Sequence, residues 1–418
     1  MSQDSIPVTV LSGNLGAGKT TLLNHLLRNA GERDLAVLVN DMGSVNVDAE
    51  RVAEDSELEV SGGVAELSNG CICCELRDDL ETAVVRLARD REFDRLIVES
   101  SGISEPEPVA RLFTTSSRVA ARYEIDALVT VLDTRLFLDS FDGTATPKRR
   151  GADPESAVDG DASTRPLSDL LIEQLEVASV VLLNKTDLCD RDELERAETL
   201  VNALQPAAEL IRTEFSVVDP DRLFDGDRFD PATLGERAGW QRALAGDEHA
   251  EPDSEPASHG PPGTDHDHRH PDEVYGVDSF VFRERRPFHP ERFHEFLRSL
   301  PSSVVRSKGI AWVAGRDVKV EISQAGPSIR ATVRGPWIAS LPEVDRQLYR
   351  SNRPDLAWDD DHGDRRTELV FIGTDLESSR LRSDLEAALV TDDELERAET
   401  LENRFPIEPE DERVLREP

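Results

Sequence analysis

A glycine-rich segment near the start of the chain contains the residues with the clearest chemistry. It reads Gly13-Asn-Leu-Gly-Ala-Gly18-Lys19-Thr20 and stands between an apolar run and a helical pattern. Glycines let successive backbone N–H groups point at phosphate oxygens, while the lysine reaches the β- and γ-phosphates and the hydroxyl binds Mg²⁺. The spacing and its context therefore predict a P-loop. The residues assigned to the nucleotide are Gly13, Gly16, Ala17, Gly18, Lys19, Thr20 and Thr21.

A second motif, Asn184-Lys185-Thr-Asp187, directly follows the apolar run 180–183. A carboxylate at its last position can accept two hydrogen bonds from the guanine edge. Adenine does not offer these donors, so a site built on them rejects it. We therefore predict that Asn184, Lys185 and Asp187 bind guanine. The motif argues against an ATP-dependent kinase, which is a further function to be considered for any P-loop.

A third motif ends the apolar run 96–98 with Glu99, and Gly102 follows three residues later. In P-loop proteins an acidic residue at this place holds Mg²⁺, and the glycine N–H senses the γ-phosphate. We predict Glu99 and Thr20 as magnesium ligands and Gly102 as a γ-phosphate contact. The competing interpretation is that Glu99 only caps the helix expected after Pro106.

Three cysteines, Cys71, Cys73 and Cys74, lie within four positions beside an Asn-Gly turn. Thiolates suit soft or borderline ions such as Zn²⁺ and Co²⁺, and three of them leave one position of a tetrahedral shell open for exchange. We predict a site for a transferred metal. Buried structural thiols and a redox role are the alternatives. Cys189 stands alone and receives no role.

These motifs require a scaffold that brings the ends of several strands together. Apolar runs alternate with helical patterns along the first half of the chain, which is typical of an α/β domain with a mostly parallel, doubly wound sheet. Strands are expected at residues 8–11, 35–39, 95–98, 127–132 and 180–183. Helices are expected at residues 20–29, 78–89, 108–113, 167–176 and 192–203.

The second half of the chain has a different pattern, which predicts a smaller α+β domain. Strands are expected there at residues 276–282, 309–314, 318–322 and 369–373, and helices at 290–300 and 376–389. The nonapeptide DELERAETL occurs twice, at 192–200 and 393–401, and we interpret both copies as acidic surface helices. The predicted organisation is a P-loop domain at 1–235 with a mobile acidic insertion at 143–165, a histidine-rich flexible linker at 236–273, the C-terminal domain at 274–395, and a loosely attached acidic tail at 396–418.

The net charge and the short apolar runs argue against some classes of partner. The chain has 418 residues and a formal charge of −37, so it repels nucleic acid and anionic membranes. Its apolar runs are too short to span a bilayer, and its start lacks a basic signal region. The acidic, lysine-poor composition is similar to that of proteins from a salt-loving cytoplasm, and we expect a cytoplasmic protein.

The order of these motifs resembles that of the CobW-type GTPases, and residues 306–312 and 369–373 resemble the C-terminal domain of that family. The resemblance implies a GTP-hydrolysing metallochaperone that uses GTP and Mg²⁺. It further implies that the CxCC cysteines carry Zn²⁺ or Co²⁺, according to the family member, to a client metalloprotein. The alternative is a nucleotide-regulated metal buffer or sensor without client insertion. A second copy of the chain is a further candidate partner.

Two more sets of residues have expected roles. Lys19 is expected to stabilise charge on the transferring phosphoryl group, and Asp41 and Glu99 are the candidates for positioning water. Family members usually carry Asn-Glu-Phe-Gly-Glu where this chain has Asn40-Asp-Met-Gly-Ser44, so a carboxylate is replaced by Ser44. In the linker, His266, His268 and His270 occupy every second position and are predicted to capture metal weakly. The alternative is that the linker is an inert spacer.

Overall fold

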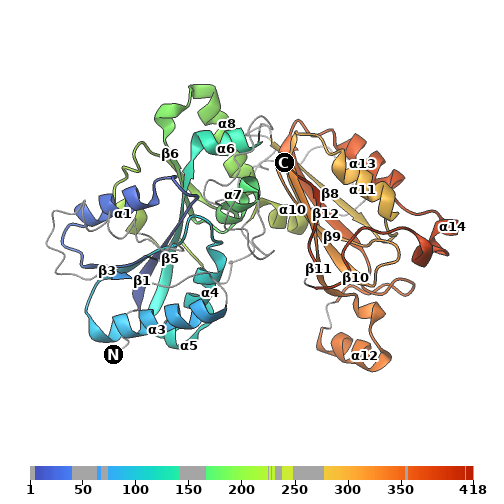
Figure 1. The fold of residues 1–418 in the computed structure, drawn as a ribbon, viewed down its shortest axis with the longest axis horizontal. Helices are drawn as coiled ribbons and strands as arrows, with labels where there is room; N and C mark the ends of the chain where they lie inside the picture. The colour runs from blue at the N-terminus through green and yellow to red at the C-terminus, as the bar shows by residue number, and fades with distance from the viewer. Residues whose placement is uncertain are drawn as a thin grey trace, which may run out of the picture. The chain divides into compact units, whose positions relative to one another are not determined.

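The computed structural model of the chain describes residues 5–39, 64–66, 74–141, 166–224, 226, 228–230, 238–247, 277–353, 356–409 and 411–417. The chain divides between Ala238 and Gly239 into two compact units, each with its own sheet (Figure 1). Within the described ranges, no helix has both the length and the apolar character needed to cross a membrane.

A seven-stranded sheet forms the centre of the first unit. Its strands are β1 (Ile6–Ser12), β2 (Leu35–Val39), β3 (Val64–Glu66), β4 (Arg95–Glu99), β5 (Tyr123–Asp133), β6 (Val180–Asn184) and β7 (Glu209–Arg212). They lie in the order β3-β2-β4-β1-β5-β6-β7, and every neighbouring pair is parallel. The five strands predicted in this half are all present. The sequence pattern predicts neither β3 nor β7, which are three and four residues long.

Helices cover both faces of this sheet, as a doubly wound fold requires. They are α1 (Lys19–Arg28), α3 (Cys74–Asp90), α4 (Glu107–Thr115), α5 (Ser117–Ala120), α6 (Thr134–Phe141), α7 (Leu167–Glu176), α8 (Arg191–Leu204) and α9 (Asp221–Phe224). Alternate strand residues serve two cores: Val8 and Val10 pack with α3, α4 and α5, whereas Leu11 packs with α1 and α9. Both faces of the strands are therefore buried, which explains their continuous apolar sequences. The predicted α/β fold is confirmed.

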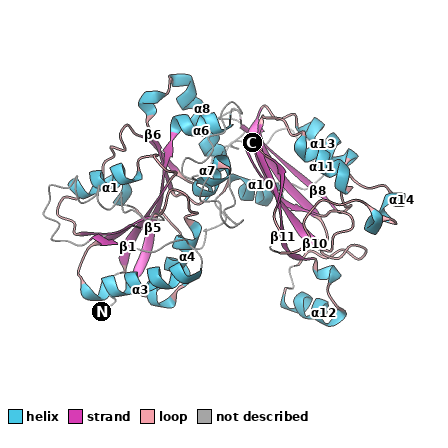
Figure 2. Cartoon of the chain, viewed as in Figure 1, coloured by secondary structure: helices cyan, strands magenta, loops and turns pink. Residues whose placement is uncertain are grey.

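The second unit is built on a six-stranded sheet in which every pair is antiparallel (Figure 2). Its strands are β8 (Val277–Glu284), β9 (Val304–Ala311), β10 (Val318–Ala325), β11 (Ser328–Pro336), β12 (Thr367–Thr374) and β13 (Arg413–Arg416), in the order β13-β11-β10-β9-β12-β8. Its helices are α10 (Gly239–Asp247), α11 (Pro290–Arg298), α12 (Glu343–Asn352), α13 (Ser378–Ala387) and α14 (Asp392–Leu395). Side chains of α11 and α13 join strand residues in one core. The predicted α+β domain is confirmed.

The expectation of a loosely attached tail is wrong. Phe405 is 2% exposed and Leu415 is buried in the core of the second unit. β13 pairs with β11 at the edge of the sheet. The acidic composition of the segment is therefore misleading, because two well-placed apolar side chains and one strand are enough to anchor it.

Two element boundaries also differ from the prediction. The residues from Gly239 to Asp247, which the sequence pattern assigns to the linker, form α10, and the carbonyl oxygen of Leu244 accepts a hydrogen bond from Arg283 of β8 at 2.7 Å. β9 begins at Val304 and ends at Ala311, although the pattern predicts a strand at 309–314. The early part of β9 contains buried polar residues such as Arg306, which hide the strand from a search for apolar runs.

The repeated nonapeptide adopts two different structures. The first copy lies inside α8, which continues to Leu204. The second copy begins in α14, which ends at Leu395, and a short 3₁₀ turn, η5 (Ala398–Thr400), follows. The prediction of a surface helix is therefore right for the first copy and wrong for most of the second.

Candidate nucleotide site and metal motif

Three strands of the first unit end at the residues that carry the motifs. β1 ends at Ser12, directly before Gly13, while β4 ends at Glu99 and β6 ends at Asn184. Because these strands are parallel, their carboxyl ends meet at one edge of the sheet, where ligands bind in such folds. The sheet therefore gathers segments that are far apart in the sequence into a single site.

The P-loop backbone requires glycine at two of its predicted contact positions. Gly13 and Gly18 have φ values of 139° and 114°, which disfavour any side chain. A Cβ atom on Gly13 would overlap the carbonyl oxygen of Val131, and one on Gly18 would lie 2.5 Å from Asn184 Nδ2. The tight approach of the loop to β5 and β6 thus depends on these two residues.

Lys19 lies inside the loop that precedes it. Its Nζ atom donates hydrogen bonds to the carbonyl oxygens of Gly13 at 2.9 Å and Asn14 at 3.4 Å, and the residue is 7% exposed. Lys19 is also the first residue of α1, so its charge adds to the positive end of that helix. The arrangement offers a phosphate group both an ammonium and the N–H groups at the start of α1.

The two predicted magnesium ligands lie next to each other. Thr20 Oγ1 is 3.2 Å from Glu99 Oε1, and Glu99 is 4% exposed. The neighbouring Ser100 hydroxyl donates to the Leu11 carbonyl oxygen at 2.9 Å, which ties the end of β4 to β1. A hydroxyl and a carboxylate this close fit the oxygen chemistry that Mg²⁺ prefers. Glu99 does not cap α4, because that helix has no side-chain cap.

Gly102 packs directly against the P-loop. A Cβ atom at this position would lie 2.8 Å from the backbone nitrogen of Leu15 and 2.9 Å from its side chain. The segment after β4 therefore touches the loop that would hold the phosphates. A γ-phosphate arriving there would meet both segments, as the sequence motif predicts.

Asn184 ties the base motif to the P-loop. Its Nδ2 atom donates to the Ala17 carbonyl oxygen at 2.7 Å and to Ser216 Oγ at 2.9 Å. Its Oδ1 atom accepts from the Ser216 N–H at 2.8 Å and from Thr213 Oγ1 at 3.2 Å. Asn184 is 2% exposed and its amide is fully bonded, so it holds the base motif against the P-loop and against the loop after β7.

Lys185 and Asp187 remain available to a base. Lys185 adopts a left-handed conformation with φ of 61°, and its Nζ atom pairs with Asp133 Oδ2 at 2.6 Å. Asp187 lies in the 3₁₀ turn η1 (Thr186–Leu188) with its side chain exposed. The carboxylate that the motif assigns to guanine is thus presented at the surface beside a fixed lysine.

The sequence motifs do not include the loop after β7, which completes this region. Ser216 Oγ donates to the Gly18 carbonyl oxygen at 3.0 Å, and Phe215 and Ser216 both adopt left-handed conformations, with φ of 53° and 56°. Such conformations are costly outside glycine and often occur at functional sites. The sequence could have indicated this loop only through the strand before it, and β7, with four residues, is too short to be recognised as an apolar run.

The two units match known domains. Residues 7–212 match the family described as CobW/HypB/UreG, nucleotide-binding domain, and residues 277–389 match the cobalamin synthesis protein cobW C-terminal domain. The chain belongs to the CobW/HypB/UreG family. This membership confirms the resemblance and, with it, the prediction of a P-loop GTPase with a CobW-type C-terminal domain.

Curated relatives of this CobW/HypB/UreG protein extend along both units. Zinc-regulated GTPase metalloprotein activator 1 of Dictyostelium discoideum is 35% identical over 416 residues, covering 94% of this chain and 81% of that protein. The zinc chaperone CobW of Pseudomonas aeruginosa is 29% identical and covers 92% of each chain. The zinc chaperone CobW of a Sinorhizobium species is 30% identical, covering 80% of this chain and 90% of that protein.

The metal motif of this family member lies mostly outside the described residues. Cys71, Cys73 and Asp41 fall there, and so do His266, His268 and His270 of the linker. Cys74 is the first residue of α3, which connects β3 to β4. Because a crossover helix runs antiparallel to its parallel strands, α3 begins at the carboxyl edge of the sheet. The end of the cysteine motif therefore lies at the same edge as the P-loop.

The described residues supply no second metal centre. Within the ranges that the structure describes, no group of three or more His, Cys, Asp or Glu side chains is arranged to hold a metal ion. Cys189 is partly buried, and its pKa is raised by burial and by the nearby Glu193. A thiol with a raised pKa is a poor ligand at neutral pH, which agrees with leaving Cys189 without a role.

Proposed function

We propose that this protein is a GTP-hydrolysing metallochaperone that loads Zn²⁺ onto its CxCC motif and delivers the ion to a client metalloprotein. The observation that carries the proposal is the position of Cys74 at the start of α3, the helix that leads into β4 and Glu99. The names of the relatives, which include zinc chaperones, favour zinc as the cargo. Co²⁺ is the second candidate, since thiolate sites accept both ions.

The residues of the first unit suggest how hydrolysis is supported. Lys19 would neutralise charge on the β- and γ-phosphates, and Asp187 would fix the guanine base. Thr20 and Glu99 would hold Mg²⁺, which supplies further positive charge at the phosphates. Asp41 and Glu99 are the candidates for orienting the attacking water. A cytoplasmic location is part of the proposal, because metal transfer through thiolates requires a reducing compartment.

The connection through α3 suggests how the nucleotide could control the metal. A γ-phosphate would contact Gly102 in the segment after β4, and the helix that leads into β4 begins at Cys74. Ordering of this region by GTP would gather the three thiolates, and hydrolysis would release them. A simple buffer would not need such a connection, because its metal affinity would not depend on the nucleotide.

The test is a competition titration of Zn²⁺ and of Co²⁺ against a chelator, with a non-hydrolysable GTP analogue and Mg²⁺ in one arm and GDP and Mg²⁺ in the other. A useful carrier should bind metal at least about a hundredfold more tightly in the GTP arm, near 2.7 kcal/mol. The variant with Cys71, Cys73 and Cys74 changed to Ser should lose both the affinity and the difference. Cys189→Ser is the matched control and should behave like the original protein.

Equal metal affinity in the two arms would contradict GTP-gated transport and favour a metal buffer. Linkage gives an independent check, because a metal that is bound more tightly with GTP must tighten GTP binding by the same factor. Metal delivery can then be followed by separating the client protein and measuring its metal content.

The base contact has its own test. Asp187→Asn should weaken GTP binding strongly and shift preference toward xanthosine triphosphate, whose extra carbonyl can accept from the new amide. Asp190→Asn, a nearby exposed substitution at the cap of α8, is the control and should leave GTP affinity unchanged. A loss below about threefold in Asp187→Asn, roughly 0.7 kcal/mol, would show that the motif does not recognise the base.

The histidines of the linker are proposed to concentrate scarce metal near the cysteines. Deletion of residues 246–272 should leave GTP turnover unchanged and slow metal loading at limiting Zn²⁺. Replacement of His266, His268 and His270 by Asn in the intact linker separates the histidines from linker length. Equal loading by that variant would reduce the segment to a spacer.

A further inference from the structure

The last residues of the second unit form a segment that is fixed along helix α11. We call residues 402–409 and 411–416 the C-terminal strap. The ring of Phe405 stacks on the ring of Phe293 in α11, with centroids 5.5 Å apart. The guanidinium of Arg316 donates hydrogen bonds to the carbonyl oxygens of Phe405 at 2.8 Å and Asn403 at 2.9 Å. Since the strap is anchored at several points, any groove beside it is already formed.

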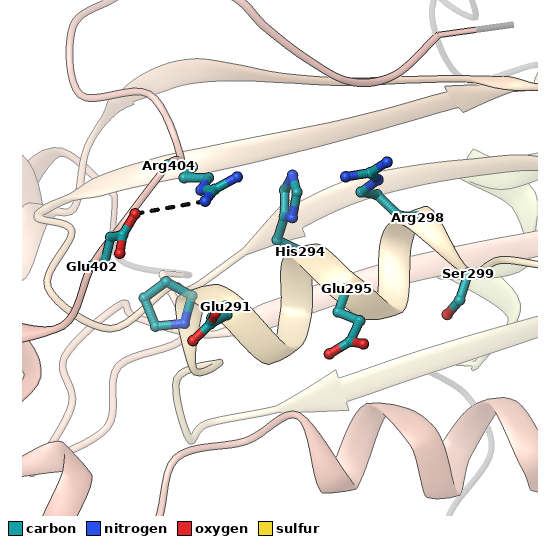
Figure 3. A pocket seen from close by; sticks show the side chains of 8 residues that line it. Glu291, His294, Glu295, Arg298, Ser299, Glu402 and Arg404 are labelled. Carbon is teal, nitrogen blue, oxygen red and sulfur yellow. Dashed lines mark ion pairs between the residues drawn. The ribbon is translucent and has the colours of Figure 1, made fainter.

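A groove follows the line between α11 and the strap. It consists of two cavities of about 550 and 430 Å³, which share His294 and Arg404 among their lining residues. In Figure 3, the side chains of His294 and Arg298 extend from α11 toward the side on which Arg404 lies, whereas Glu295 extends from the opposite side of the helix. The second cavity adds Arg316 and Arg413. We call the two cavities together the strap groove.

Two arginines of the strap groove, Arg298 and Arg404, have little charge compensation, whereas Arg413 pairs with Asp411 at 3.3 Å. Within the described part of the chain, the guanidinium of Arg298 has no hydrogen-bond or ion-pair partner. Arg404 pairs only with Glu402 at 3.7 Å, and the two side chains are 67% and 83% exposed, so the pair contributes little. Arg316 donates only to carbonyl oxygens, which satisfy its hydrogen bonds without cancelling its charge.

The surroundings of His294 agree with a positive groove. Burial lowers the pKa of His294, and the charges of Arg404 and Arg298 lower it further. A second positive charge is therefore unfavourable at this point, as it would be beside any uncompensated arginine. Four arginines and four carboxylates line the two cavities, and the positive charge is concentrated on the side of α11 that carries His294 and Arg298, opposite Glu295 (Figure 3).

Carboxylates are the groups that suit this groove best. An arginine fork pairs with a carboxylate through two parallel hydrogen bonds, and the groove is large enough for several side chains. Beside the second cavity, Ile407 and Val414 are 59% and 51% exposed, which provides an apolar contact. We propose that the strap groove binds an acidic segment of a partner protein, with Arg298 and Arg404 pairing with its carboxylates and Ile407 and Val414 contacting an apolar side chain.

A polyphosphate backbone fits the same groove less well. Four carboxylates also line the two cavities, and they would repel a continuous row of phosphates: Glu291, Glu295, Glu402 and Asp411. A peptide can place single carboxylates at the arginines and leave other positions neutral. The proposal concerns the second unit alone and does not depend on GTP hydrolysis or metal transfer.

The test uses the full-length protein and a short fluorescein-labelled peptide in which single glutamates are separated by neutral residues that include leucine, followed by fluorescence anisotropy. Arg298→Glu with Arg404→Glu should weaken peptide binding by at least about tenfold, and added salt should weaken binding to the original protein. The matched control is Arg350→Glu with Arg353→Glu, two exposed arginines of the same unit that line neither cavity. It should bind the peptide like the original protein.

Three outcomes decide the proposal. Equal losses in the groove variant and in the control would show that only overall charge matters and would overturn it. Inorganic phosphate or a single-stranded oligonucleotide binding while the peptide does not would also overturn it. A loss confined to the groove variant, with unchanged GTP turnover and unchanged unfolding, would support it.

A second readout reports on the groove itself. Peptide carboxylates beside His294 should raise its pKa, because they favour the charged imidazolium. Proton NMR titration with and without the peptide measures this shift, and His294→Gln identifies the resonance. No shift in the presence of saturating peptide would place the binding elsewhere and contradict the proposal.

Discussion

In the first unit, Gly13, Glu99 and Asn184 stand at the ends of parallel strands that share one edge. In the second unit, Arg298 comes from a helix and Arg404 from a strap near the end of the chain. The first arrangement is produced by the sheet itself, because parallel strands with crossover helices always gather their carboxyl ends. The second depends on particular contacts, such as Phe405 against Phe293. The two units therefore differ in how directly a local sequence determines a site.

The strongest test of this difference is Lys19→Ala. If the strand-end site acts as a unit, GTP turnover should fall by at least about a thousandfold, because the substitution removes charge at the phosphates. The peptide affinity of the strap groove should not change. Arg298→Glu with Arg404→Glu should have the opposite effect. Peptide affinity should fall, and GTP turnover should be unchanged in the same assay in concentrated KCl. Substantial turnover in Lys19→Ala would contradict the P-loop assignment.

The repeated nonapeptide makes the same comparison with the local sequence held constant. Both copies begin with a capping box, formed by Asp190 and Glu193 in one and by Thr391 and Glu394 in the other. The first copy is followed by Val201 and Leu204, which are buried and extend the apolar face of α8. The second copy is followed by polar residues and then by Phe405, whose side chain is buried in the core of the second unit. Burial beyond the repeat thus decides whether the helix continues.

Leu200→Ala and Leu401→Ala are the same substitution at the same place in the two copies. Leu200 is 3% exposed, whereas Leu401 is only partly buried. We expect losses of about 2–4 kcal/mol for Leu200→Ala and below about 1 kcal/mol for Leu401→Ala. Equal losses would show that the nonapeptide itself, and not its surroundings, sets its stability.

Each unit can be followed separately in urea. The tryptophans of the chain all lie in the second unit, so intrinsic fluorescence follows that unit alone: Trp240, Trp312, Trp337 and Trp358. Release of a fluorescent GDP analogue follows the first unit. Leu200→Ala should shift only the nucleotide signal and Leu401→Ala only the tryptophan signal.

The sequence predicts the nucleotide site well because its residues lie in short motifs after apolar strands. Glu99 and Asn184 can be assigned from their neighbours along the chain, since an apolar run that ends in a polar motif marks a strand end. Ser216 cannot, because its role depends on hydrogen bonds to Gly18 and Asn184, which a local pattern does not contain. The prediction of a loose tail is wrong for the same reason, since acidic composition indicates solvation and does not reveal the burial of Phe405.

The smallest expected effect concerns Glu394, the third residue of α14 and the carboxylate of the capping box at the second copy. The bidentate contact of Arg292 and the N–H of Thr391 hold the pKa of Glu394 well below its usual range. A carboxyl with a lowered pKa in the folded state stabilises the protein above its unfolded pKa of about 4.3, and this contribution is lost as the pH falls toward the folded value. Glu394→Gln should therefore lower the urea midpoint of the tryptophan transition at pH 7. The difference from the original protein should shrink below about pH 4.3. Glu399→Gln, in the same copy but outside this contact, should show no such pH dependence; an equal loss at all pH values in Glu394→Gln would show that the ionised carboxylate adds nothing beyond its shape.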